Sequence, residues 1–153
     1  MRRDHLWLET QLEFLLSKYF SDVKITNPIE IRFGREAKYR FGSIRLLKGN
    51  GFKSLKLLKS LKKQEPQKSI ITITSMFAKK AVPVKVVQYT IGHELCHYAH
   101  GFSSTNRRLF KFPHHGGIVN RELAERGAHD LITAYKKWLK VYRKKILENR
   151  LKG

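Results

Sequence analysis

The segment HELCH at residues 93–97 constrains this chain more than any other feature. It falls within a stretch of helical periodicity that we expect to span residues 84–100, opened by Pro83 and stopped by Gly101. Because an α-helix has about 3.6 residues per turn, the two histidines of the segment share one face, one turn apart. The sequence therefore predicts a helix that presents two imidazoles to the same side.

Two imidazoles in this arrangement can bind one zinc ion, at Zn–N distances of about 2.0–2.1 Å. Glu94 directly follows the first histidine, so its carboxylate lies beside the ion without ligating it. From there it can accept a proton from the attacking water and pass it to a leaving amine. The pattern predicts one Zn²⁺ per chain on His93 and His97, with Glu94 as the catalytic base of a hydrolase.

A catalytic zinc site needs a third protein ligand and one open position. His100 shares the helix face, but three ligands from one straight helix rarely surround an ion. His114 and His115 lie in a segment bracketed by glycine and proline, which can return under the helix. Glu122 or Glu125 would give a site of two histidines and one carboxylate. The residues leave these alternatives open and favour the two loop histidines.

The segments before the HELCH helix predict a helix followed by strands. Residues 4–20 have mostly helical spacing of apolar side chains and predict an amphipathic helix. Residues 29–33 alternate and predict a strand, and residues 38–48 predict a second strand interrupted by Gly42. Residues 52–63 fit either a basic amphipathic helix or a twisted strand.

The β-branched segment 69–74 predicts a further strand. Residues 101–120 predict a loop, and a last helix is expected from near Asn120 to about Arg150. Together these elements predict an α+β fold with three main helices in a single domain over residues 1–153.

The charge of the chain indicates its partners. Lysine and arginine number 32 against 12 acidic residues, which gives a net charge of +20. A chain this basic attracts polyanions, so we expect sequence-tolerant binding of nucleic acid through the lysines of residues 53–63 and of the last helix. An anionic membrane surface is the weaker competitor, and no membrane association is expected.

The single cysteine, Cys96, excludes an intrachain disulfide and a cysteine-based zinc ribbon, and we expect it to be a small core residue. Residues 4–20 carry Asp4, Glu9 and Glu13, unlike an export signal, and no apolar run is long enough to span a bilayer. We therefore expect a cytoplasmic monomer, located in part on DNA.

Two segments carry a family resemblance. VPVKVVQYTIGHELCHYAHG at residues 82–101 and PHHGGIVNRELAERG at 113–127 resemble the SprT-like zinc metalloprotease domain of the zincin-like peptidases. The resemblance implies a zincin-like α+β domain with a small curled sheet, an N-terminal helix, the HExxH helix and a C-terminal helix. It also implies that residues 69–74 form an exposed edge of the sheet, along which we expect an extended substrate to add its own backbone. The family's His-Gly pair matches His115-Gly116, which implies His115 as the third ligand in preference to His114.

The resemblance also implies an activity. It indicates a zinc metalloendopeptidase with a protein or peptide substrate, and several relatives act on proteins bound to DNA. Two features depart from the family: Val119 replaces a large aromatic residue, and the Cys-rich ribbon of many relatives is missing. Two other functions fit the sequence: a non-catalytic nucleic-acid-binding module with a structural metal, and a regulatory peptidase with one protein substrate.

Overall fold

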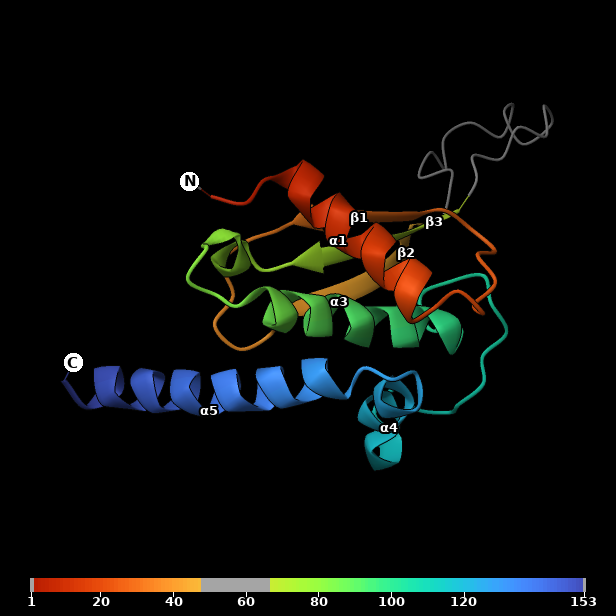
Figure 1. Ribbon diagram of the computed structural model, residues 1–153. Coiled ribbons are helices and arrows are strands. Elements are labelled where there is room, and N and C mark those ends of the chain that lie inside the picture. The colour runs from red at the N-terminus through yellow and green to blue at the C-terminus, as the bar shows by residue number, and fades with distance from the viewer. Residues whose placement is uncertain (1, 48–66, 153) are drawn as a thin grey trace, which may run out of the picture.

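The computed structural model describes residues 2–47 and 67–152 of the chain, and the expected helix or strand at 52–63 lies outside them. The described residues form an α+β fold with four α-helices and a mixed three-stranded sheet (Figure 1). None of the helices in this part of the chain is long and apolar enough to cross a membrane.

The elements agree with several of the sequence predictions. In chain order they are α1 (His5–Lys18), β1 (Ile29–Phe33), β2 (Gly42–Leu47), β3 (Lys68–Ile73), the 3₁₀ turn η1 (Ser75–Ala78), α3 (Val84–Ala99), the 3₁₀ turn η2 (His115–Gly117), α4 (Ile118–Glu125) and α5 (His129–Lys152). The first helix, the strand at 29–33 and the HELCH helix are confirmed, with small shifts at their ends.

The strand order of the sheet is β1-β3-β2, with β1 parallel and β2 antiparallel to β3. The prediction that residues 69–74 form an exposed edge is therefore wrong, because β3 is hydrogen-bonded on both sides. The reason lies in the composition of the strand. Ile70, Ile71 and Ile73 are at most 2% exposed, and a near-continuous buried apolar run is typical of a central strand.

The strand expected at 38–48 begins only at Gly42. The preceding residues leave the sheet to meet α5, where the hydroxyl of Tyr142 donates to the carbonyl of Lys38 at 2.8 Å. Phe41 is buried and packs edge-on against Trp138, with ring centroids 5.5 Å apart. Aromatic packing against α5 therefore explains why the strand starts at Gly42 and not at residue 38.

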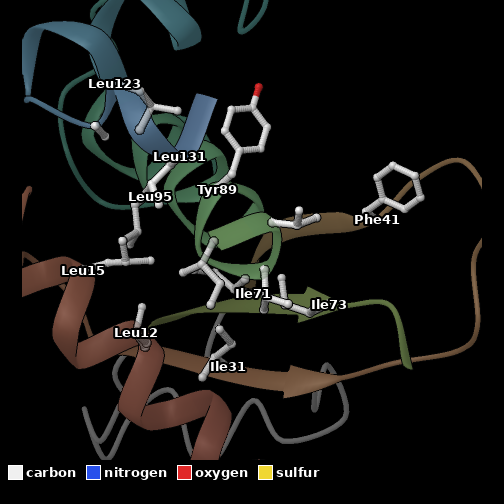
Figure 2. Close-up of a cluster of buried hydrophobic side chains, with 14 of the residues drawn as sticks. Leu12, Leu15, Ile31, Phe41, Ile71, Ile73, Tyr89, Leu95, Leu123 and Leu131 are labelled. Atoms are coloured by element: carbon white, nitrogen blue, oxygen red, sulfur yellow. The ribbon is translucent and has the colours of Figure 1, made fainter. Parts of the chain in front are cut away.

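Helices α1 and α3 pack side by side on the sheet, since α1 contacts β1 and α3, and α3 contacts β2 and β3 (Figure 1). Figure 2 shows the buried side chains that meet there, among them Leu12, Leu15, Ile31, Ile71, Ile73 and Leu95. Leu123 of α4 and Leu131 of α5 join the same core from the other side of α3. The HELCH helix is thus packed between the sheet and the C-terminal helices.

The prediction of one continuous helix from Asn120 to Arg150 is wrong. Gly127 has a φ of +86°, and the amide of Ala128 donates to the carbonyl of Leu123 at 2.9 Å. A left-handed glycine ends a helix in this way, so α4 stops and α5 starts in a new direction. The turn buries Ala128 and lets α5 run along α3.

Candidate metal centre

The end of α3 is fixed by a glycine turn. Gly101 has a φ of +83°, its amide donates to the carbonyl of Tyr98 at 3.1 Å, and the amide of Phe102 donates to the carbonyl of His97 at 2.9 Å. A Cβ atom at position 101 would lie 2.5 Å from the backbone of Arg107. Only glycine fits here, and the turn sets the last helical turn, which carries His97.

The loop that follows α3 is tied back to the helix and to the sheet. The amide of Leu109 donates to the carbonyl of His100 at 2.9 Å. The hydroxyl of Ser69, at the start of β3, donates to the carbonyl of Ser103 at 2.6 Å. With the loop held in this way, its far end comes back to α3. Pro113 and His114 line the same cavity as His93.

Three imidazoles converge on one point. His114 Nε2 lies 3.0 Å from His93 Nε2 and 3.0 Å from His97 Nε2, and the ligand nitrogens of all three lie within 4.8 Å of one another. One neutral imidazole nitrogen has a single in-plane proton or lone pair, so one hydrogen bond does not account for both contacts. Nitrogens bound to one tetrahedral zinc ion are about 3.3–3.4 Å apart for bonds of 2.0–2.1 Å. The two 3.0 Å contacts are close to this separation, so the three histidines are a candidate donor set for zinc.

The protonation of these histidines also suits metal binding. Burial, together with smaller contributions from the charges of His97 and His114, lowers the pKa of His93 to about 3. Burial likewise lowers the pKa of His97 to about 4. Neutral imidazole is the form that binds metal. His97 Nδ1 is buried and has no hydrogen-bond partner among the described residues. No carboxylate or carbonyl oxygen in this part of the chain therefore orients the His97 ring by accepting a hydrogen bond from Nδ1.

Glu94 lies beside the cluster and is 6% exposed. Burial raises the pKa of its carboxyl to about 7, and the positive charge of Arg40 opposes the rise. A Cβ atom at Gly42 would lie 3.5 Å from Glu94 Oε2 and 2.7 Å from the methyl group of Thr90. The lack of a side chain at Gly42 therefore leaves space for α3 to place the carboxylate directly under the start of β2.

These groups line one cavity of about 410 Å³. It contains His93, Glu94, His97 and His114, and its far wall includes Gly42 and Ile44 of β2. Tyr135 of α5 closes one side and stacks on Tyr89, with ring centroids 4.0 Å apart. The cluster of three histidines, a buried carboxylate and a strand thus face the same space.

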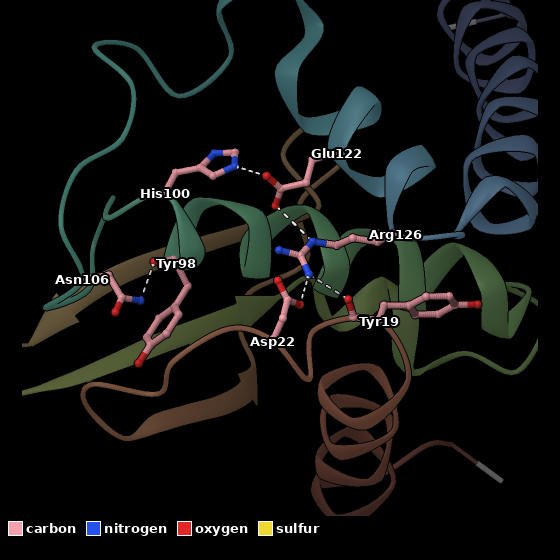
Figure 3. A network of polar contacts seen from close by, with 7 residues as sticks. All are labelled: Tyr19, Asp22, Tyr98, His100, Asn106, Glu122 and Arg126. Atoms are coloured by element: carbon pink, nitrogen blue, oxygen red, sulfur yellow. Dashed lines mark hydrogen bonds and ion pairs between the residues drawn. The ribbon is translucent and has the colours of Figure 1, made fainter.

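The other candidate ligands have different positions. His100 is buried and its Nε2 lies 2.5 Å from Glu122 Oε1, while Glu122 Oε2 accepts from Arg126 Nε at 3.2 Å (Figure 3). Arg126 also binds Asp22 and the Tyr19 carbonyl, so this network joins α3, α4 and the end of α1. Glu125 is exposed on α4.

His115 is placed only in part, because the structure describes its backbone in η2 and not its side chain. The expected preference for His115 over His114 therefore stays a prediction, whereas the described cluster contains His114. Cys96 is fully buried, which confirms it as a small core residue, and burial raises the pKa of its thiol.

Part of the site wall was not predicted from the sequence. Gly42 was expected only to interrupt a strand, and neither Arg40 nor Tyr135 was expected at the site. A glycine inside a strand often marks a close backbone approach, and that signal was available at Gly42. The placement of Tyr135 depends on the turn at Gly127, which no local pattern revealed.

A comparison of the chain with protein-family models, with curated proteins and with solved structures finds no match in any of the three.

Proposed function

We propose that this chain is a zinc-dependent metallopeptidase with a zincin-like fold, as its resemblance to SprT-like domains implies. The observation that carries the proposal is the convergence of His93, His97 and His114 at 3.0 Å contacts, with the carboxylate of Glu94 in the same cavity. A purely structural metal site has no need for a buried carboxylate beside an open cavity. This combination favours catalysis over the non-catalytic module.

The residues divide the reaction between them. His93, His97 and His114 would hold the ion, which when bound polarises the substrate carbonyl and lowers the pKa of a water to about 7. Glu94 would accept a proton from the attacking water as the water oxygen bonds to the carbonyl carbon. Glu94 then returns the proton to the amide nitrogen as the C–N bond breaks. The products are a carboxylic acid and an amine.

Removing the metal tests this function. The zinc-loaded protein should hydrolyse a fluorescently labelled unfolded protein, and the activity should disappear with a chelator and return when zinc is added back. The cleavage products should be followed by gel electrophoresis and mass spectrometry. Hydrolysis that persists after complete removal of the metal would refute a metallopeptidase, and zinc binding without any hydrolysis would favour the structural-metal module.

The strand suited to bind an extended substrate is β2, which is an edge of the sheet among the described residues. The amide of Thr74 donates to the carbonyl of Phe41 at 2.8 Å, and hydrogen-bonded positions alternate along an antiparallel pair. The register pairs Gly42 with Ile73, so the backbone groups of Gly42 and Ile44 point away from β3. Both residues line the cavity with Glu94.

Hydrogen exchange tests this binding mode. Addition of an uncleaved peptide inhibitor should slow exchange at the Ile44 amide, because that amide would gain a partner on the substrate backbone. The amide of Arg45 is the internal control, since it already faces β3 and should change little. Equal protection at both positions, or none at Ile44, would refute addition of the substrate to β2.

We also propose that the enzyme acts on proteins associated with nucleic acid. The net charge of +20 supports this, and the lysines of α5, such as Lys136, Lys140 and Lys144, are exposed. These three are spaced four residues apart and lie along one side of the helix. Such a row can contact successive phosphates without reading the base sequence.

Reversal of Lys136, Lys140 and Lys144 to glutamate should weaken binding to all duplex sequences alike. Each lost phosphate contact reduces the log–log salt slope by about 0.9, so three lost contacts reduce it by up to about 2.7. The slope should be measured by fluorescence anisotropy with labelled DNA between low and moderate salt. Zinc content is the control and should not change. An unaltered slope would show that this row does not touch phosphate.

A further inference from the structure

A second hollow, of about 390 Å³, adjoins the cavity of the metal centre. The two share three lining residues, Tyr39, Phe41 and Tyr135. A polypeptide that passes Glu94 can therefore continue into the second hollow over this aromatic wall. The remainder of the second hollow is lined by Lys38 and by residues of α5.

The lining of the second hollow combines aliphatic and cationic groups. Leu139, Ile146 and Leu147 provide the aliphatic part, and Leu147 is 58% exposed. Lys38, Arg143 and Arg150 provide the cations, all of them exposed. Among the described residues, no acidic side chain lines the hollow. Glu36, whose charge reaches Tyr142 nearby, is paired with Lys79 at 3.7 Å.

The walls of the hollow are already joined without a ligand. The guanidinium of Arg150 donates to the hydroxyl of Tyr39 and lies 5.7 Å from the centre of its ring. The hydroxyl of Tyr142 donates to the carbonyl of Lys38 at 2.8 Å. Because these contacts hold α5 against residues 38–39, little ordering is needed when a ligand binds.

We propose that this hollow is a substrate subsite that binds an acidic segment of polypeptide, flanking the bond to be cleaved, through one apolar side chain and neighbouring carboxylates. Charge complementarity supports this occupant, as does continuity with the cavity of Glu94. A nucleic acid has no need of the aliphatic floor, and exposed lysines elsewhere on α5 offer phosphate contacts. The inference rests on the proposed peptidase function.

The test measures binding separately from cleavage, with the zinc-loaded Glu94→Gln protein. The probes are two fluorescein-labelled peptides, one with Asp and Glu on either side of a leucine and one with Lys at both positions. The double variant Arg143→Glu/Arg150→Glu should bind the acidic peptide about tenfold or more weakly, since two charge-assisted contacts are lost. Its binding of the lysine peptide should improve, and an unchanged zinc content shows that the variant is folded.

The matched control is Lys137→Glu/Lys145→Glu, which makes the same charge change at exposed positions of α5 outside the hollow. It should alter the affinity for either peptide by less than the arginine pair does. If both double variants weaken binding of the acidic peptide equally, the effect comes from net charge alone, and the proposal is overturned. The proposal also fails if the arginine pair abolishes oligonucleotide binding and leaves peptide binding intact. Selective peptide binding without hydrolysis by the unsubstituted enzyme would support the subsite and count against the peptidase.

Discussion

Glu94→Gln should reduce peptide hydrolysis by about 10²–10⁴-fold, the usual contribution of a general base. The amide is nearly the same shape as the carboxylate but cannot accept a proton from the attacking water at neutral pH. Fold and zinc content should be retained, because Glu94 is not among the three converging ligands. The measurement is kcat/KM on a labelled unfolded protein, together with zinc per chain.

Glu13→Gln is the matched control, since it removes one exposed carboxylate on α1 by the same chemical change. Its kcat/KM should equal that of the unsubstituted protein. Full turnover by the Glu94 variant would remove the proposed base and with it the mechanism. Loss of zinc in that variant would instead mean that the carboxylate is a ligand.

His114→Ala should lose zinc. The loss of zinc affinity should exceed about 10–100-fold, which is typical when a group that only hydrogen-bonds to a metal ligand is changed. His114 Nε2 contacts both other imidazoles, so its removal leaves two ligands from one helix and no group that closes the site. Affinity should be measured by competition with a chromophoric chelator. Hydrolysis should fall in parallel with zinc occupancy.

Two further histidine variants sharpen this result. His5→Ala on α1 is the control, because His5 is exposed and pairs only with Glu9 in the described structure, and zinc binding should not change. His115→Ala separates the two loop histidines: the described cluster predicts that this variant keeps zinc, whereas the SprT-like resemblance predicts that it loses zinc. If His115→Ala loses zinc while His114→Ala keeps it, the ligand implied by the SprT-like resemblance is the correct one.

Local patterns were sufficient to predict the helix that carries the candidate metal centre. Pro83 and Gly101 bound it, and the spacing of His93 and His97 places both on one face. The strand at 29–33 and the helix at 5–18 have similarly clear periodicity. In these elements the local preference and the tertiary packing agree, so a single sequence was enough.

Three features depended on contacts between distant residues. Whether β3 is central or at an edge depends on which strands pair with it, and its run of isoleucines, which is typical of a buried central strand, was not used in the prediction. The break at Gly127 depends on α5 packing against α3. The contact of His114 with His93 depends on the hydrogen bonds that hold the loop after α3 against the helix and the sheet. The number of residues between His93 and His114 does not predict these hydrogen bonds.

An anomalous-difference map at the zinc absorption edge, from crystals grown with zinc, tests whether the three histidines bind zinc. We expect one strong peak per chain between the Nε2 atoms of His93, His97 and His114, with the carboxylate of Glu94 close to it but not bound to it. A map with no peak at these three nitrogens, or with its peak at Glu122 or Glu125, would refute the proposed zinc site.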